Sequence, residues 1–146
     1  MPTGKILIVD DDEDIRQLVG TSLSNRGYEV ISASSGDEGL AMAVSGQPDM
    51  IVLDVEMPGM DGIQTCQEIR KHLMVPVLFL SVRSEETDVV LGLGVGADNY
   101  LTKPFRIPEL IAHVDAAMRR KLRYSQAVRT DQAMRVKDLT LDLSAH

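Results

Sequence analysis

The sequence predicts an α/β fold: a doubly wound parallel sheet of the (βα)5 type with strand order 2-1-3-4-5. Short apolar runs of strand length alternate along the chain with helical patterns that carry one apolar face. Most of these runs are apolar throughout, which is typical of strands buried on both faces of a parallel sheet. The length of 146 residues suits one domain with a single core.

The first strand is expected at Lys5–Val9, a short run rich in β-branched residues. Asp12 or Asp11 should cap the helix after it, because a short acidic side chain can accept hydrogen bonds from the free N–H groups there. Gly27 should end this helix, and the second strand follows at 28–33. The inward face of the helix is predicted to consist of Ile15, Leu18, Val19 and Leu23.

The second helix should begin at Ser35 and end near Gly46, and the third strand covers residues 49–54 and ends in a carboxylate. Asp61 is expected to cap a third helix that extends to about Leu73. The inward residues of the second helix are predicted to be Leu40, Ala41 and Val44. Those of the third are predicted to be Ile63, Cys66 and Ile69.

The fourth strand is expected at 76–81, and a fourth helix at roughly 84–95. This helix is weak, because each of two internal glycines costs about 1 kcal/mol relative to alanine. A short fifth strand follows at 99–102, and Pro108 lies in the first turn of a fifth helix. The inward face of that helix is predicted to be Leu110, Ile111, Val114 and Met118.

The pattern changes after the fifth helix. Residues 1–122 form the predicted domain, and 123–137 are polar without a sustained period, as in a linker. Residues 138–146 contain one alternating segment, which resembles a half-buried strand. A single strand cannot form a domain, so this segment is predicted to be the start of a further unit.

Charge and composition exclude several classes of function. Residues 1–118 carry 8 basic and 19 acidic side chains, a net charge of −11, whereas 119–146 carry a net charge of +4. An acidic body argues against direct binding of nucleic acid by that body. No apolar run approaches the roughly 20 residues of a membrane helix, and the single cysteine, Cys66, fits a reducing compartment. The expected location is therefore the cytoplasm, without a membrane partner.

Acidic side chains end two strands that are neighbours in the predicted order. Asp10 and Asp11 follow the first strand, and Asp54 ends the third. Three adjacent carboxylates repel one another unless a cation lies between them. Oxygen-only ligands suit a hard divalent ion, with Mg²⁺ favoured over Ca²⁺.

Two further side chains are expected at the same edge of the sheet. Ser81 ends the fourth strand, and Lys103 follows the fifth. Acids, a metal, a hydroxyl and an ammonium together make a site for a phosphoryl group on Asp54. Asp54 is the predicted nucleophile, which would form an aspartyl phosphate.

Four motifs make the chain similar to the receiver domain of bacterial response regulators, over about residues 4–122. The motifs are LIVDDD ending at Asp12, LDVEMPGMDG at 53–62, LSV around Ser81, and GADNYLTKPF at 96–105. The resemblance implies a flavodoxin-like fold. It also implies a signalling switch with at most slow autodephosphorylation, in which Asp54 accepts a phosphoryl group from a sensor histidine kinase.

The resemblance further implies a role for each residue at the site. Asp11 and Asp54 would bind Mg²⁺ directly together with the backbone carbonyl of Glu56, and Asp10 would act through water. Lys103 would pair with the phosphoryl group, and its bond to Pro104 is expected to be cis. On phosphorylation, a hydroxyl would turn inward and an aromatic ring would follow it. These two switch residues are Ser81 and Tyr100.

Three residues at the mouth of the site are expected to tune loss of the phosphoryl group. Val82 stands where the family usually has a small residue, so it should hinder small phosphodonors and attacking water. Glu56 and Arg83 have opposite charges and can pair across the mouth, an exposed interaction worth at most about 1 kcal/mol. These features predict slow loss of the phosphoryl group.

The last residues, VKDLTLDLSAH at 136–146, are similar to the opening strand of the winged-helix effector domain in OmpR/PhoB-type regulators. This implies that the chain is the N-terminal part of a transcriptional regulator, and that DNA is bound only through the missing C-terminal domain. Such receivers form homodimers through the fourth helix, fifth strand and fifth helix. Several positions lack the charges expected there, which predicts weaker or more apolar pairing; these are Val89, Gly94, Asn99, His113 and Asp115.

Three alternatives remain open from the sequence. A stand-alone receiver would signal by docking a partner protein. A phosphohydrolase with an aspartyl-phosphate intermediate would need a second Asp where Glu56 stands, and a substrate-covering cap. A metal-free flavin-binding domain of the same strand order is disfavoured because the nearby acids would repel the flavin phosphate.

Overall fold

The five parallel strands form one sheet in the order β2-β1-β3-β4-β5, as the sequence predicts. The computed structural model describes residues 3–83 and 99–121. The strands are β1 (Lys5–Val9), β2 (Glu29–Ala33), β3 (Met50–Asp54), β4 (Val77–Ser81) and β5 (Asn99–Thr102). The helices are α1 (Glu13–Asn25), α2 (Gly36–Gly46), α3 (Gly62–Ile69) and a helical segment at 107–121.

Predictions for three parts of the chain fall outside the described residues. These parts are the helix at 84–95, the linker at 123–137 and the segment at 138–146. Among the residues that are described, no helix is long and apolar enough to cross a membrane.

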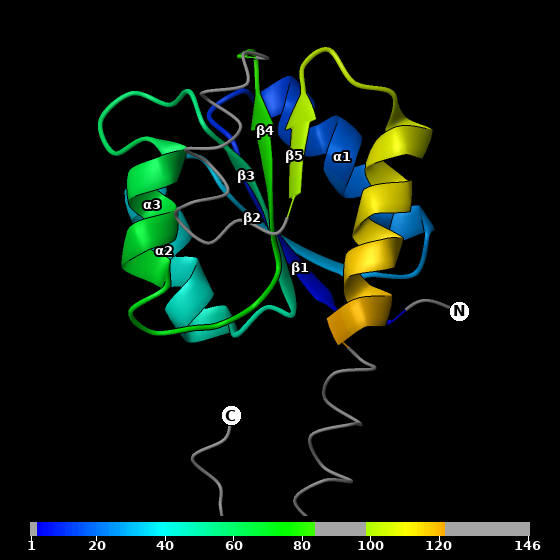
Figure 1. Cartoon of the computed structure of the whole chain (residues 1–146), viewed down its shortest axis with the longest axis horizontal. Coiled ribbons are helices and arrows are strands. Elements are labelled where there is room, and N and C mark those ends of the chain that lie inside the picture. Colours follow the sequence, from blue (N-terminus) through cyan, green and yellow to red (C-terminus); the bar gives the residue numbers. More distant parts are fainter. Residues whose placement is uncertain (1–2, 84–98, 122–146) are drawn as a thin grey trace, which may run out of the picture.

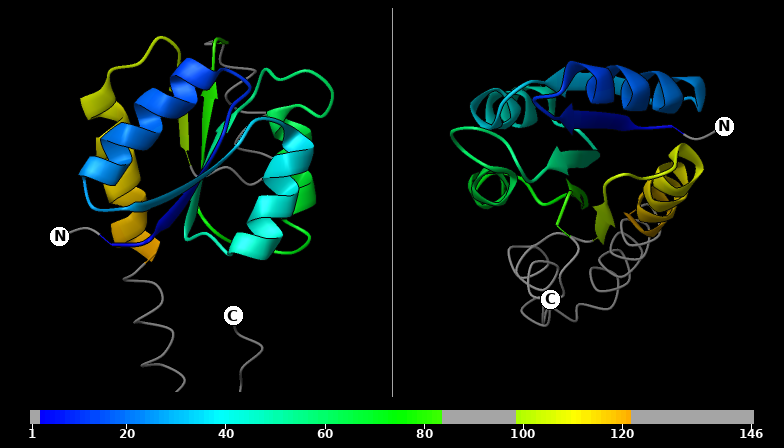
Figure 2. Two further views of the ribbon diagram at one scale, coloured as in Figure 1. Left: turned by 180° about the vertical axis from the view of Figure 1, so that it is seen from behind. Right: turned by 90° about the horizontal axis from the view of Figure 1, so that it is seen from above.

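Helices cover both faces of the sheet. Figures 1 and 2 show α1 and the segment 107–121 on one face, and α2 and α3 on the other. Side chains alternate between the faces: Leu7 and Val9 of β1 pack in the core toward α2 and α3, whereas Ile6 and Ile8 pack in the opposite core. Because both faces are covered, β3 and β4 are buried at every residue. This explains their continuous apolar runs.

Side-chain caps begin three helices where the sequence predicts them. The carboxylate of Asp12 accepts hydrogen bonds from the N–H groups of Asp14 and Ile15. The Ser35 hydroxyl caps α2, and Asp61 forms a reciprocal capping box at the start of α3. These caps fix where each helix starts relative to the carboxyl edge of the sheet.

The predicted inward faces of α1 and α2 are confirmed in part, since Val19 and Leu23 are buried and Leu40 packs against the core, but three residues differ. Leu18 and Val44 are 51% and 43% exposed and Ala41 is also exposed, so these three inward predictions are wrong. The helices instead turn glycines inward, since Gly20 faces β1 and β2 and Gly39 faces β1. A residue two positions away lies about 200° around the helix, so Leu18 and Ala41 point outward.

The third helix is shorter than predicted, since α3 ends at Ile69 and residues 70–72 form turns. Arg70 Nη1 donates a hydrogen bond to the Val75 carbonyl at 2.7 Å, which turns the chain back toward β4. The predicted end near Leu73 is therefore wrong by about one helical turn.

A buried polar cluster joins the segment 107–121 to the end of α1. The Asp115 carboxylate, only 9% exposed as a residue, accepts hydrogen bonds from Arg26 Nη2 at 2.6 Å and from the Tyr28 hydroxyl at 2.5 Å. Burial raises the pKa of Tyr28, and the bond to Asp115 adds to that shift. Burial alone would raise the pKa of Asp115, but the bonds from Arg26 and Tyr28 outweigh it and lower the pKa.

This cluster gives a partner within the chain to Asp115, one of the positions where the charge expected on the dimer face is missing. Its carboxylate is turned into the molecule and paired within the chain. His113 is also engaged within the chain, because its Nδ1 lies at hydrogen-bond distance from the Asn99 side-chain amide. Both residues therefore have hydrogen-bond partners within the chain.

A second ion pair holds the other end of the same segment. Lys121 Nζ lies 2.8 Å from Asp49 Oδ1, and the other oxygen of this carboxylate accepts the Lys5 N–H at 2.8 Å. The segment 107–121 is thus attached to the rest of the domain at two points besides its apolar face.

Replacement of Asp115 by alanine is expected to destabilise the domain by about 1–3 kcal/mol at pH 7, because the buried Tyr28 hydroxyl loses its acceptor. Since the folded-state pKa of Asp115 is lowered, its contribution is complete above the ordinary value of 3.8 and is lost as pH falls below it. Urea unfolding at pH 7 and pH 3 measures both effects.

Tyr28→Phe is the matched control. It removes one hydrogen bond but leaves the pairing with Arg26, so a smaller loss is expected. Equal stability of Asp115→Ala and wild type at pH 7 would show that the cluster contributes nothing.

Candidate functional site

Three carboxylates meet at the carboxyl edge of the sheet. Strands β1 and β3 pair in register with Val9 opposite Leu53. Asp10 and Asp54, the next residue after each of these, therefore lie side by side at the carboxyl edge of the sheet. Asp10 and Asp54 are buried and Asp11 is exposed, and one oxygen from each lies within 4.8 Å of the others. The sheet order therefore creates the acidic cluster that the sequence predicts.

The ammonium of Lys103 lies among these acids. Its Nζ is 3.0 Å from Asp54 Oδ1 and 3.4 Å from Asp10 Oδ2. The backbone N–H of Lys103 donates to the Ser81 carbonyl at 2.7 Å, which extends the β4–β5 ladder as far as the site. The Lys103–Pro104 peptide bond is cis, as predicted.

The electrostatics of Asp54 reflect two opposing influences. Burial raises the pKa of Asp54 to about 7, and the negative charge of Asp10 acts in the same direction, whereas the hydrogen bond from Lys103 lowers it. For Lys103, burial lowers the pKa, but the bond to Asp54 and the charge of Asp10 outweigh burial and raise it. Lys103 is therefore held as a cation between two buried acids.

The donor set fits a hard divalent cation. Ligands lie about 2.1 Å from Mg²⁺ and about 2.3–2.6 Å from Ca²⁺, so separations up to 4.8 Å are close to those spanned by two ligands of one ion. The exposed position of Asp11 leaves that side open to water, which Mg²⁺ retains. Among the described residues, the carboxylates of Asp10, Asp11 and Asp54 could hold such an ion, and the backbone carbonyl of Glu56 stays a predicted further ligand.

The loop after Asp54 is folded back tightly on its own strand. The Gly62 N–H donates to the Val55 carbonyl at 2.9 Å, and a Cβ on Gly62 would lie 2.7 Å from Val55 Cα and still closer to the Asp54 carbonyl. Gly59 adopts a φ of +75°, which favours glycine. The glycines therefore allow α3 to start directly beside the acidic cluster.

Ser81 and Glu56 form a contact that the sequence did not indicate. The Ser81 hydroxyl donates to Glu56 Oε2 at 2.5 Å, and the Val82 N–H donates to Glu56 Oε1 at 2.9 Å. The predicted pair with Arg83 is present but longer, with Nε 3.7 Å from Oε2. The main partners of the Glu56 carboxylate are thus a hydroxyl and a backbone N–H at the end of β4.

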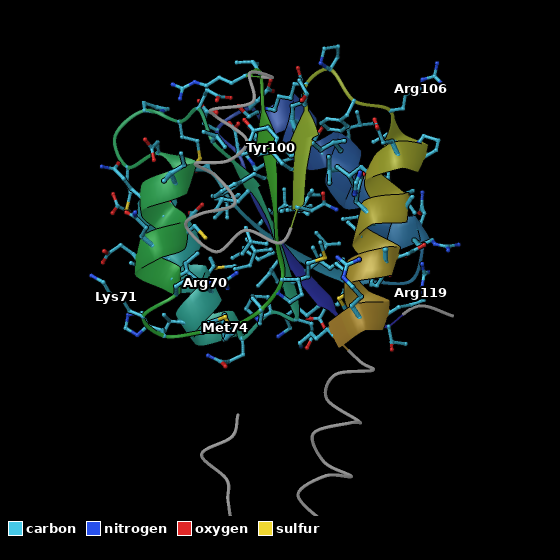
Figure 3. The ribbon with its side chains drawn as sticks, viewed as in Figure 1. Arg70, Lys71, Met74, Tyr100, Arg106 and Arg119 are labelled. Atoms are coloured by element: carbon cyan, nitrogen blue, oxygen red, sulfur yellow. The ribbon has the colours of Figure 1, made fainter. Side chains whose placement is uncertain are left out.

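The other switch residue is linked to this group. The Arg83 N–H donates to Ser81 Oγ at 3.0 Å, and the Tyr100 hydroxyl donates to the Arg83 carbonyl at 3.0 Å. The Tyr100 ring meets Phe79 edge to face, with centroids 6.4 Å apart. Figure 3 shows Tyr100 beside β4 and β5, and its side chain packs against the core on the face of the sheet that α2 and α3 cover.

The structure thus gathers the predicted residues into two neighbouring groups. The first is Asp10, Asp11, Asp54 and Lys103. The second is Glu56, Ser81, Val82, Arg83 and Tyr100. Sequence reasoning missed Arg16, whose Nη1 donates to the Asp10 carbonyl at 2.7 Å and fixes the end of β1. The spacing of Arg16, one turn after the Asp12 cap, could have indicated it.

Comparison with known proteins agrees with this geometry. The family model of the response regulator receiver domain matches residues 6–115, and the chain belongs to this family. The solved receiver domain of the Francisella response regulator 1452 has a TM-score of 0.77 and 37% identity, covering 80% of this chain and 98% of that one. The domain is therefore a signalling switch of two-component systems.

Two relatives are described as transcriptional regulators. The alkaline phosphatase synthesis transcriptional regulatory protein PhoP of Bacillus subtilis is 50% identical over 117 residues, which cover 80% of this chain and 49% of PhoP. The probable transcriptional regulator ycf27 of Guillardia theta is 42% identical over 142 residues, which cover 96% of this chain and 56% of ycf27. The chain spans about half the length of these two relatives.

Gly62→Ala is expected to destabilise the domain by about 1–3 kcal/mol, because the added methyl group displaces the backbone beside Asp54. Gly20→Ala in α1 is the matched control: its Cβ would lie 3.7 Å from Ile8 and Val30, an ordinary contact. This control should gain up to about 1 kcal/mol from helix propensity. Urea unfolding compares the two variants, and equal effects would contradict the proposed close approach at Gly62.

Proposed function

We propose that Asp54 is the phosphoacceptor of a two-component signalling switch. It takes a phosphoryl group from a sensor histidine kinase in a Mg²⁺-dependent reaction, and the resulting conformational change controls a C-terminal DNA-binding effector domain. The observation that carries the proposal is the environment of Asp54, a buried carboxylate with two acids and the Lys103 ammonium around it.

The reaction needs an ionised Asp54. One of its oxygens attacks the phosphorus of a phosphohistidine; the new P–O bond forms as the P–N bond breaks, and the histidine nitrogen recovers a proton. Lys103 favours the ionised form of Asp54 and can then neutralise oxygens of the transferred group. A bound divalent ion would supply further positive charge at those oxygens.

The proposed output is control of transcription. Both relatives described above are named as transcriptional regulators and extend well beyond the part that this chain matches. The acidic character of residues 1–118 supports DNA contact through another domain rather than through this one. The kinase partner and the cytoplasmic location follow from the same proposal.

Incubation with acetyl phosphate and Mg²⁺ should add one phosphoryl group to the wild type and none to Asp54→Ala, because the variant lacks the carboxylate oxygen that attacks the phosphorus. Intact-mass spectrometry measures the addition, and a chelator in place of Mg²⁺ should abolish it. Asp12→Asn is the matched control, since asparagine also caps helices and this acid lies outside the cluster; it should be phosphorylated like the wild type. A phosphoryl group on Asp54→Ala would refute the assignment.

Val82→Ala is expected to shorten the lifetime of the phosphorylated form about threefold, equivalent to ~0.6 kcal/mol of barrier. Val82 is 63% exposed at the end of β4, where its side chain can hinder an attacking water. The lifetime is measured by following the loss of the phosphorylated form over time with intact-mass spectrometry. Val44→Ala, another exposed valine on α2, should leave it unchanged, and an unaltered lifetime in Val82→Ala would rule out the hindrance.

A further inference from the structure

We propose that the Glu56 carboxylate competes with the phosphoryl group for the same hydrogen-bond donors and thereby holds the switch in its resting arrangement. Glu56 is thus a positioning residue, which acts through Ser81 and Val82 rather than on the reacting atoms. This inference rests on the proposed phosphorylation of Asp54.

The two donors converge on one anion. The Ser81 hydroxyl donates to Oε2 of Glu56 and the Val82 N–H donates to Oε1, so one carboxylate accepts both bonds. The side chain of Glu56 is only 27% exposed, which limits competition from water. A hydroxyl and an adjacent backbone N–H aimed at the same point form a small anion-binding site.

The same two donors are the ones at the edge of the sheet beside Asp54. Strand β4 pairs with β3 so that Leu80 lies opposite Asp54, and the Val55 N–H donates to the Leu80 carbonyl at 2.9 Å. Ser81 and Val82 therefore follow directly at the level of the acidic cluster. Lys103 pairs with Asp54 and Asp10, so the Ser81 hydroxyl and the Val82 N–H add neutral donors to the charged one at the same edge of the sheet.

The Glu56 contact is also connected to Tyr100. The Ser81 oxygen accepts the Arg83 N–H, and the Arg83 carbonyl accepts the Tyr100 hydroxyl. When Ser81 leaves Glu56 for a phosphoryl oxygen, the 81–83 turn loses the bond that fixes its start. The competition therefore couples occupancy of Asp54 to the position of the Tyr100 ring.

The test uses beryllofluoride with Mg²⁺, a stable stand-in for the phosphoryl group. Its dissociation constant is measured by fluorine NMR titration of wild type, Glu56→Gln and Glu56→Ala. Alanine frees both donors, and binding should tighten about tenfold, since bonds to a charged acceptor are the strong ones. Glutamine keeps one neutral acceptor oxygen, so its gain should be intermediate, about threefold.

Two controls separate competition from simple removal of a negative charge. Glu68→Gln changes the net charge equally at the far end of α3 and should leave the affinity unchanged. In a Ser81→Ala background, removal of Glu56 should give a gain of less than about threefold, because one of the contested donors is gone. The amide resonance of Val82 provides a direct signature, and it should shift on Glu56→Gln before any beryllofluoride is added.

The beryllofluoride affinities distinguish competition by Glu56 from its absence. A tenfold gain that depends on Ser81 supports the competition. An unchanged affinity in Glu56→Ala, or a gain that persists undiminished in the Ser81→Ala background, overturns it while leaving phosphorylation of Asp54 intact. Failure of the wild type to bind beryllofluoride with Mg²⁺ overturns the proposed function and the competition together.

Discussion

Two buried carboxylates, those of Asp10 and Asp54, share the ammonium of Lys103 at the carboxyl edge of the sheet. Like charges at this separation oppose folding unless a cation offsets them, and the three side chains come from three different strand ends. The arrangement therefore requires β1, β3 and β5 to be in register, which the backbone pairing of β1 with β3, β3 with β4 and β4 with β5 provides. Much of the fold can be understood as a support for this one electrostatic arrangement.

The same principle extends to the neighbouring group. The Glu56 carboxylate accepts hydrogen bonds from the Ser81 hydroxyl and the Val82 N–H, so this acid, like Asp54, is paired with donors from another strand end. Glu56 reaches them because the loop before Gly62 is folded tightly on β3. A change of charge on one acid must then redistribute several hydrogen bonds, which is the requirement for a two-state switch.

Periodicity and capping predicted the elements well, since β1 is found at Lys5–Val9 and Asp12 caps α1 as expected. These features depend on local backbone chemistry. The prediction that Leu18 faces inward was wrong because Gly20 faces the sheet instead and lets the helix approach it closely. A search for apolar periodicity cannot find this, because glycine is not counted as an apolar side chain. The partners of Asp115 and Glu56 depend on contacts between residues 25 or more positions apart. Contacts between residues so far apart do not produce a periodic pattern in the sequence, so they could not be predicted from it.

The two attachments of the segment 107–121 have a mechanical consequence. Arg26 holds Asp115 near its middle, and Asp49 holds Lys121 at its end. A pivot of this helix about either attachment would break the ion pair at the other, so both pairs oppose such a movement. Tyr100 packs on the opposite face of the sheet, against the core that α2 and α3 cover. A rearrangement around Tyr100 therefore changes the surface on that face without breaking either attachment.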